Sequence, residues 1–94
     1  MKVEFTFDKA QIQRYGYTVD AVRQTILRGF AAKGLCCVSA DDPMTFMGRG
    51  RKEDFSNIWA ILMALLRTDW FPKFAASCIW YDDDGTQEDV LSQA

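Results

Sequence analysis

The spacing between apolar residues changes along this chain of 94 residues, and the order in which the spacings occur limits the folds that the chain can adopt. Residues 2–7 alternate between apolar and polar side chains, which predicts a strand with one buried face and one exposed face. In residues 18–33, apolar side chains instead recur every three to four positions, and Thr18 stands where a helix N-cap is expected. The chain therefore begins with a strand and a helix.

The remaining segments complete the order β-α-β-β-α-β. Residues 35–39 and 44–48 read as two short strands joined by an Asp-Asp-Pro turn. A wide apolar stripe predicts a second helix that begins between residues 52 and 54 and ends near 68, and residues 75–81 form a final strand. This order predicts an α+β fold, a ferredoxin-like sandwich in which two helices cover one face of a four-stranded antiparallel sheet.

Length and composition favour one globular domain over residues 1–94, because 49% of the residues are hydrophobic and Gly and Pro are few. The longest apolar stretch, residues 58–66, is less than half of the roughly 20 residues that cross a bilayer. The first residues lack a signal-peptide core, and three cysteines, two of them adjacent, make no disulfide framework. We expect a cytoplasmic protein without a membrane partner.

The chain contains no histidine, which removes most hydrolytic mechanisms and nearly all ordinary zinc sites. Cys36, Cys37 and Cys78 lack CxxC spacing and a cluster of neighbouring cations, so buried thiols are expected in place of reactive ones. The sequence thus predicts a protein that is not an enzyme and that uses no metal and no cofactor.

Charge is divided unevenly along the chain. Residues 1–81 hold all 11 basic residues and eight of the 13 acidic ones, whereas residues 82–94 are acidic without a base. Asp82, Asp83 and Asp84 precede a glycine, but the acids that follow do not have the spacing of a calcium loop. We expect residues 82–94 to form an acidic turn and tail, with a short helix near its end, that can guide a basic partner.

A basic loop precedes the second predicted helix. Arg49, Arg51 and Lys52 alternate with two glycines there, a composition that can hold a phosphate, and Arg14 adds a further cation. The acidic residues at the start of the helix would repel an anion, so a solvated loop is the favoured interpretation. Nucleic-acid binding through these four cations is kept as an alternative.

An excess of apolar residues surrounds the end of the second helix. Trp70, Phe71 and Phe74 follow it within five positions, with Lys73 among them. Such a cluster belongs either to the core of a small domain or to an interface with a protein partner, which includes a second copy of the chain.

Residues 3–8 leading to 16–18, and residues 80–85 leading to 88–93, resemble segments of small accessory proteins encoded on mobile elements of Firmicutes. The resemblance implies no catalytic residue, and it implies binding to a host or element-encoded macromolecule in order to regulate or inhibit it. The leading hypothesis is therefore a non-enzymatic protein-binding module, and the alternatives are a nucleic-acid-binding accessory protein and a dimeric small-ligand protein.

Overall fold

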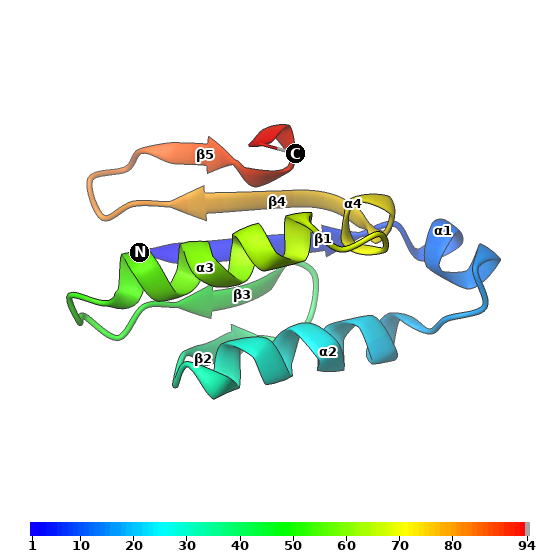
Figure 1. Cartoon of the computed structure of the whole chain (residues 1–94), viewed down its shortest axis with the longest axis horizontal. Helices are drawn as coiled ribbons and strands as arrows, with labels where there is room; N and C mark the ends of the chain where they lie inside the picture. Colours follow the sequence, from blue (N-terminus) through cyan, green and yellow to red (C-terminus); the bar gives the residue numbers. More distant parts are fainter. Residues whose placement is uncertain (94) are drawn as a thin grey trace.

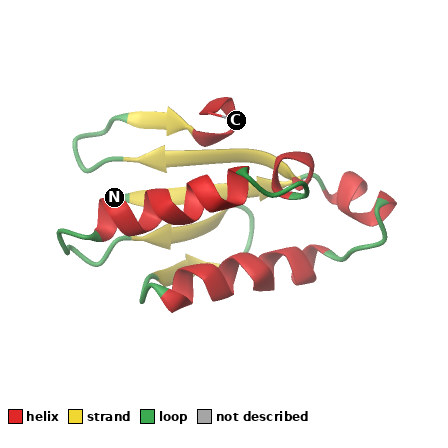
Figure 2. Cartoon of the chain, in the orientation of Figure 1, coloured by secondary structure: helices red, strands yellow, loops and turns green. Residues whose placement is uncertain are grey.

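In the computed structural model, which describes residues 1–93, helices pack against one face of a five-stranded sheet (Figures 1 and 2). The long helices α2 and α3 run along this face, and the short ones lie at its edges. In chain order the elements are β1 (Lys2–Phe7), α1 (Lys9–Arg14), α2 (Val19–Ala32), β2 (Cys36–Ser39), β3 (Met44–Met47), α3 (Asp54–Leu66), α4 (Phe71–Phe74), β4 (Ala75–Tyr81), β5 (Gln87–Asp89) and the 3-10 helix η1 (Val90–Gln93).

The strands follow the order β2-β3-β1-β4-β5, and every neighbouring pair is antiparallel. β1 lies at the centre, where Phe5 is opposite Met44 on one side and Cys78 on the other. Because side chains alternate across a strand, these three residues share the face that the helices cover. All three are fully buried.

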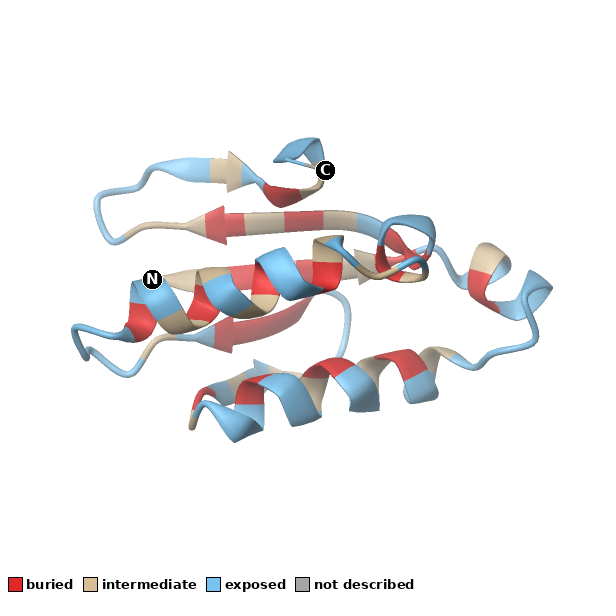
Figure 3. Cartoon of the chain, in the orientation of Figure 1, coloured by how far each residue is buried: buried red, intermediate tan, exposed pale blue. Residues whose placement is uncertain are grey.

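Buried residues lie along the central strands and on the helices that cover them (Figure 3), and Phe5 of β1 is fully buried among them. Its ring meets three others edge to face, with centroids 5.9–6.0 Å away, and they belong to Phe30 of α2, Phe46 of β3 and Phe71 of α4. Such aromatic pairs contribute about 0.5–1.5 kcal/mol each beyond the burial of their area. These contacts join the central strand to its neighbour β3, to the long helix α2 and to the short helix α4.

Local sequence signals begin the first two helices. The Thr18 side chain accepts a hydrogen bond from the amide of Ala21 at 3.1 Å, so the predicted N-cap of α2 is confirmed. Asp8 does the same for α1 through the amide of Gln11 at 3.0 Å. The sequence does not predict α1, because its six residues present a single buried side chain, Ile12, and so show no apolar period.

The predicted α+β class is confirmed, but the predicted four-stranded sheet is wrong, because β5 adds a fifth strand beside β4. The sequence predicts an acidic turn and tail over residues 82–94, with a short helix near its end. Residues 82–86 reverse the chain, with the amide of Asp82 donating to the carbonyl of Thr86 at 2.8 Å. Residues 87–89 then pair with β4, and the helical turn η1 follows them.

Two short helices, α1 and α4, add to the two that the sequence predicted. Within residues 1–93, no helix is long and apolar enough to pass through a membrane.

Candidate functional site

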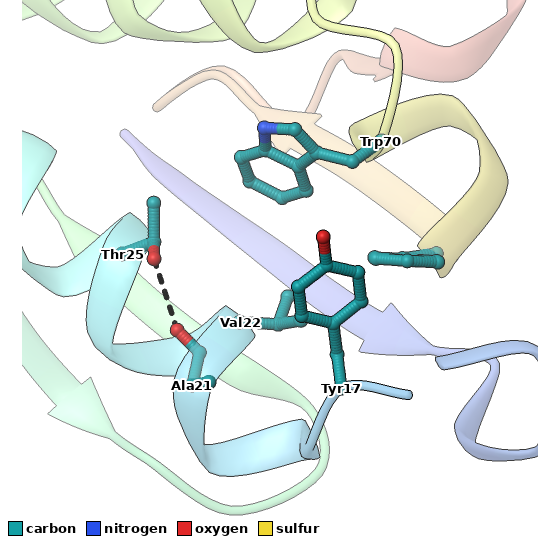
Figure 4. Close-up of a pocket in the computed structure, with 6 residues that line it drawn as sticks. Tyr17, Ala21, Val22, Thr25 and Trp70 are labelled. Carbon is teal, nitrogen blue, oxygen red and sulfur yellow. Dashed lines mark hydrogen bonds between the residues drawn. The ribbon is translucent and has the colours of Figure 1, made fainter. Parts of the chain in front are cut away.

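A pocket of about 240 Å³ opens between α2 and α4, and we call it the α2–α4 pocket (Figure 4). Two aromatic rings face it from different parts of the chain, Tyr17 from the residues before α2 and Trp70 from the residues before α4. Its complete lining is Tyr17, Ala21, Val22, Thr25, Trp70 and Phe74. Most of this surface is aromatic or aliphatic, as in sites that bind an apolar group.

The turn from α3 into α4 places Trp70 at the pocket. The Thr68 hydroxyl donates to the carbonyl of Leu65 at 2.6 Å and accepts from the amide of Phe71 at 3.1 Å, which joins the two helices. Phe71 and Phe74, three residues apart on one turn, are 0% and 4% exposed. Because these two rings fill the core, Trp70 is left half-buried at the surface.

Two tyrosines lie on the other side of Phe74. The ring centroids of Tyr15 and Tyr17 lie 5.8 Å and 5.7 Å from that of Phe74, and the two side chains are 50% and 57% exposed. Gly16 between them has a φ of 80°, a value that glycine adopts without strain. Although both tyrosines contact Phe74, Tyr17 lines the pocket and Tyr15 does not.

Polar groups at the pocket belong to its α2 wall and its rim. The Thr25 hydroxyl donates to the carbonyl of Ala21 at 2.9 Å and accepts from the Arg28 guanidinium at 3.4 Å. On the α4 side, the Lys73 ammonium lies 5.3 Å from the centre of the Tyr15 ring. The six lining residues include no carboxylate, amine or thiol, and the phenol of Tyr17 is the one ionisable group among them.

In the basic loop before α3, which could in principle bind a phosphate, the carboxylate of Asp54 occupies the backbone donors. The Asp54 side chain, in a residue that is only 6% exposed, accepts hydrogen bonds from the amides of Gly50 at 2.8 Å and Arg51 at 3.0 Å. Arg49 is also engaged, because its guanidinium donates to the carbonyl of Gly34 at 3.0 Å. The backbone donors that would bind a phosphate are therefore already satisfied within the chain.

The cations predicted to act together are divided between the two ends of the molecule (Figure 1). Arg14 ends α1, whereas Arg51 and Lys52 lie in the loop before α3, at the opposite end of the longest axis. A cleft of about 480 Å³ at that loop combines Arg51 and Lys52 with the carboxylates of Asp54 and Asp83. The amine of Met1 also lies there, paired with Asp83, so three cations face two carboxylates and the cleft has an excess of one positive charge, which is small for a polyanion site.

The acidic turn uses its carboxylates locally. Asp82 accepts from the amide of Asp83 at 2.7 Å, and Asp84 accepts from the amide of Thr86 at 2.9 Å. The hydrogen bonds from Thr86 lower the pKa of the Asp84 carboxyl. Asp83 forms an ion pair with the amine of Met1. Asp82 and Asp84 thus stabilise the turn between β4 and β5, and Asp83 lines a cleft together with Arg51 and Lys52 of the basic loop.

The three cysteines differ in exposure. Cys78 is fully buried in the core, and burial, followed by the charge of Asp89, raises the pKa of its thiol. Cys37 is half-buried, and its thiol donates to the carbonyl of Ser39 at 3.2 Å, whereas Cys36 is exposed. Among the described residues, no group of three or more acidic or cysteine side chains is arranged to hold a metal ion.

A second aromatic cluster lies on α3, away from the pocket. Phe55 is 52% exposed, and its ring centroid lies 6.3 Å from that of Trp59 and 5.7 Å from that of Trp80. Trp59 and Trp80 are themselves 5.5 Å apart, and Trp80 is buried. Phe55 therefore covers an internal pair of indoles.

Of the predicted aromatic segment, Trp70 and Phe74 line the pocket, Lys73 is exposed, and Phe71 is buried in the core. The other lining residues, Tyr17, Ala21, Val22 and Thr25, were not among the predicted site residues. One signal was present, because two large tyrosines flank a glycine in a stretch without apolar period. No family model, curated protein or solved structure matches this chain.

Proposed function

We propose that the protein is a small non-enzymatic protein-binding module, and that the α2–α4 pocket receives a side chain of its macromolecular partner. The observation that carries the proposal is the presentation of Trp70 and Tyr17 on two walls of one apolar pocket. Tryptophan and tyrosine dominate the residues that contribute most to protein–protein binding, and such residues cluster at pockets. The resemblance to accessory proteins of mobile elements favours the same class of partner.

The pocket fits the alternatives less well. Its volume of about 240 Å³ lies below the roughly 300–1,000 Å³ of sites for small molecules and cofactors. The nucleic-acid alternative depended on the loop before α3, where Asp54 already occupies two backbone donors. A protein partner needs neither a larger cavity nor a free cluster of cations.

We also propose that the fold is a ferredoxin-like sandwich extended by one strand. The order β2-β3-β1-β4 and the antiparallel pairing of all neighbours support this assignment. So do the long helices, because α2 connects β1 to β2 and α3 connects β3 to β4, and in each case one other strand lies between the two connected strands in the sheet. β5 is then an addition at the β4 edge. In such a sandwich the α2–α4 pocket lies at the end of the helical layer.

The test compares Tyr17→Ala with Tyr15→Ala, since both tyrosines are exposed and contact Phe74 but Tyr17 alone lines the pocket. The tagged full chain and the two variants are used to capture proteins from cells that carry the gene. We expect a partner that the wild type and Tyr15→Ala retain and that Tyr17→Ala loses, while thermal unfolding shows similar stability for both variants. Equal capture by all three chains would remove the pocket from the function.

A further inference from the structure

The size of the α2–α4 pocket restricts what can enter it. A closed apolar cavity of about 150 Å³ accommodates benzene, and sites for drug-sized ligands begin near 300 Å³. At about 240 Å³, this pocket has room for one ring-sized or leucine-sized group and not for a packed helix face. Aromatic rings and the aliphatic side chains of Ala21 and Val22 line it, so the group that enters is apolar.

Two cations lie next to residues that line the pocket. The Arg28 guanidinium donates to the Thr25 hydroxyl at 3.4 Å, and Lys73 directly precedes Phe74 in α4, with its ammonium 5.3 Å from the centre of the Tyr15 ring. Within residues 1–93, neither forms an ion pair with a carboxylate, although Lys2, Lys9 and Arg23 do. Unpaired cations around an apolar pocket are complementary to a partner that brings carboxylates beside its apolar group.

Two carboxylates near the pocket in sequence must be weighed against these cations. Asp20 precedes Ala21, but at 3.6 residues per turn, about 100° per residue, it lies on the side of α2 away from Val22 and Thr25. Asp69 is exposed and precedes Trp70, so it opposes the positive charge in part. Arg28 and Lys73 together carry two positive charges and Asp69 carries one negative charge, so the net charge of these three residues is positive.

Resting on the proposed function, we infer that the partner presents a short acidic segment that inserts one large apolar side chain into the α2–α4 pocket. Asp or Glu residues on either side of this anchor then pair with Arg28 and Lys73. The anchor contacts Trp70 and Tyr17, and the carboxylates determine which apolar segments are accepted.

The experiment selects random dodecapeptides displayed on phage against the immobilised full chain, with parallel selections on Tyr17→Ala and on the control Val38→Ala, an exposed residue of β2 outside the pocket lining. We expect the peptides that wild type and Val38→Ala enrich, and Tyr17→Ala does not, to carry a Phe, Tyr, Trp or Leu flanked by Asp or Glu. A synthetic peptide from this set should bind roughly fivefold more weakly to Arg28→Glu and to Lys73→Glu. The control Lys52→Glu, at the far end of the molecule, should leave its affinity unchanged.

The outcomes separate the inference from the proposed function. Peptides that depend on Tyr17 but carry no acidic residues, or whose affinity is the same for Arg28→Glu and Lys73→Glu as for wild type, overturn the acidic partner and leave the protein-binding pocket. A selection without any Tyr17-dependent peptide overturns both.

Discussion

The loop before α3 allows a specific prediction, because a side chain at position 48 would need the space that the Asp54 carboxylate occupies. Asp54 accepts two backbone hydrogen bonds, from Gly50 and Arg51. A Cβ added at Gly48 would lie 2.6 Å from the carboxylate oxygen Oδ2 of Asp54 and 3.0 Å from its Cγ. The backbone of Gly48 is held in place, since its amide donates to the carbonyl of Met1 at 2.9 Å. An alanine at position 48 must therefore displace the Asp54 carboxylate.

The expected magnitudes follow from these contacts. Gly50 and Arg51 are exposed, so water can replace the carboxylate at their amides, and Asp54→Ala should cost about 1–2 kcal/mol, as the loss of a helix cap does. Gly48→Ala should lower the free energy of unfolding by up to the same amount, because the added Cβ displaces the Asp54 carboxylate and so breaks the same hydrogen bonds. In an Asp54→Ala background the displaced atoms are gone and the nearest remaining atom is a Cβ at 3.3 Å. The double variant should then be about as stable as Asp54→Ala alone.

The assay is urea unfolding at 25 °C, followed by tryptophan fluorescence and analysed as a double-mutant cycle. We expect a coupling free energy of about 1–2 kcal/mol between positions 48 and 54. Gly29→Ala is the control, because a Cβ there meets no atom within 4 Å and position 29 is helical. It should stabilise the chain by about 0.5–1 kcal/mol and add independently to Asp54→Ala. If the costs of Gly48→Ala and Asp54→Ala simply add, the carboxylate does not occupy the space that the structure assigns to it.

Three further predictions concern the core, the buried thiol and the basic loop. Phe71→Ala should destabilise the chain by about 3–5 kcal/mol and lower the midpoint of a circular dichroism melt by more than 10 °C, because Phe71 is fully buried against Phe5; a change below 1 kcal/mol would contradict its place in the core. Because burial raises the pKa of the Cys78 thiol, the folded chain keeps this proton while the unfolded chain loses it above about pH 8.5. The free energy of unfolding should therefore fall by about 1 kcal/mol between pH 7.5 and 9.5, and Cys78→Ala should show none of this loss. Single- and double-stranded oligonucleotides at low salt should produce no saturable change in tryptophan fluorescence, whereas saturable binding with a steep salt dependence would restore Arg49, Arg51 and Lys52 as a nucleic-acid site.

Secondary structure was predicted correctly from the sequence where a regular spacing of apolar residues extends over a whole segment. The alternation of residues 2–7 predicted β1, and the stripe after Thr18 predicted α2, because each pattern extends over several side chains that share one buried face. β5 could not be predicted in this way. Its three residues, Gln87–Asp89, contain no apolar side chain, and the strand forms through backbone pairing with β4.

The aromatic segment shows why the site was predicted only in part. Residues 70–74 contain three aromatic rings, and the sequence alone does not say which of them face the core. The short helix α4 decides this, because Phe71 and Phe74 are three residues apart and so point to the same side, whereas Trp70 does not. Tyr17 reaches the pocket from about 50 residues earlier in the chain, a long-range contact that no local pattern contains.

The two ends of the molecule differ in whether their polar and apolar groups find partners within the chain. This difference is the strongest physical reason to propose binding at the α2–α4 pocket. At the loop before α3, cations and backbone donors meet the chain's own carboxylates, Asp54 and Asp83, so a charged ligand would have to displace them. At the α2–α4 pocket, the apolar surface of Trp70 and Tyr17 is not covered by the described chain. Burying one large apolar side chain there contributes about 1.5–3 kcal/mol, whereas each exposed ion pair at the rim contributes about 1 kcal/mol or less. Affinity at this pocket should therefore come mainly from the anchor, and salt should weaken it only modestly, in contrast to the steep salt dependence that binding through the basic loop would show.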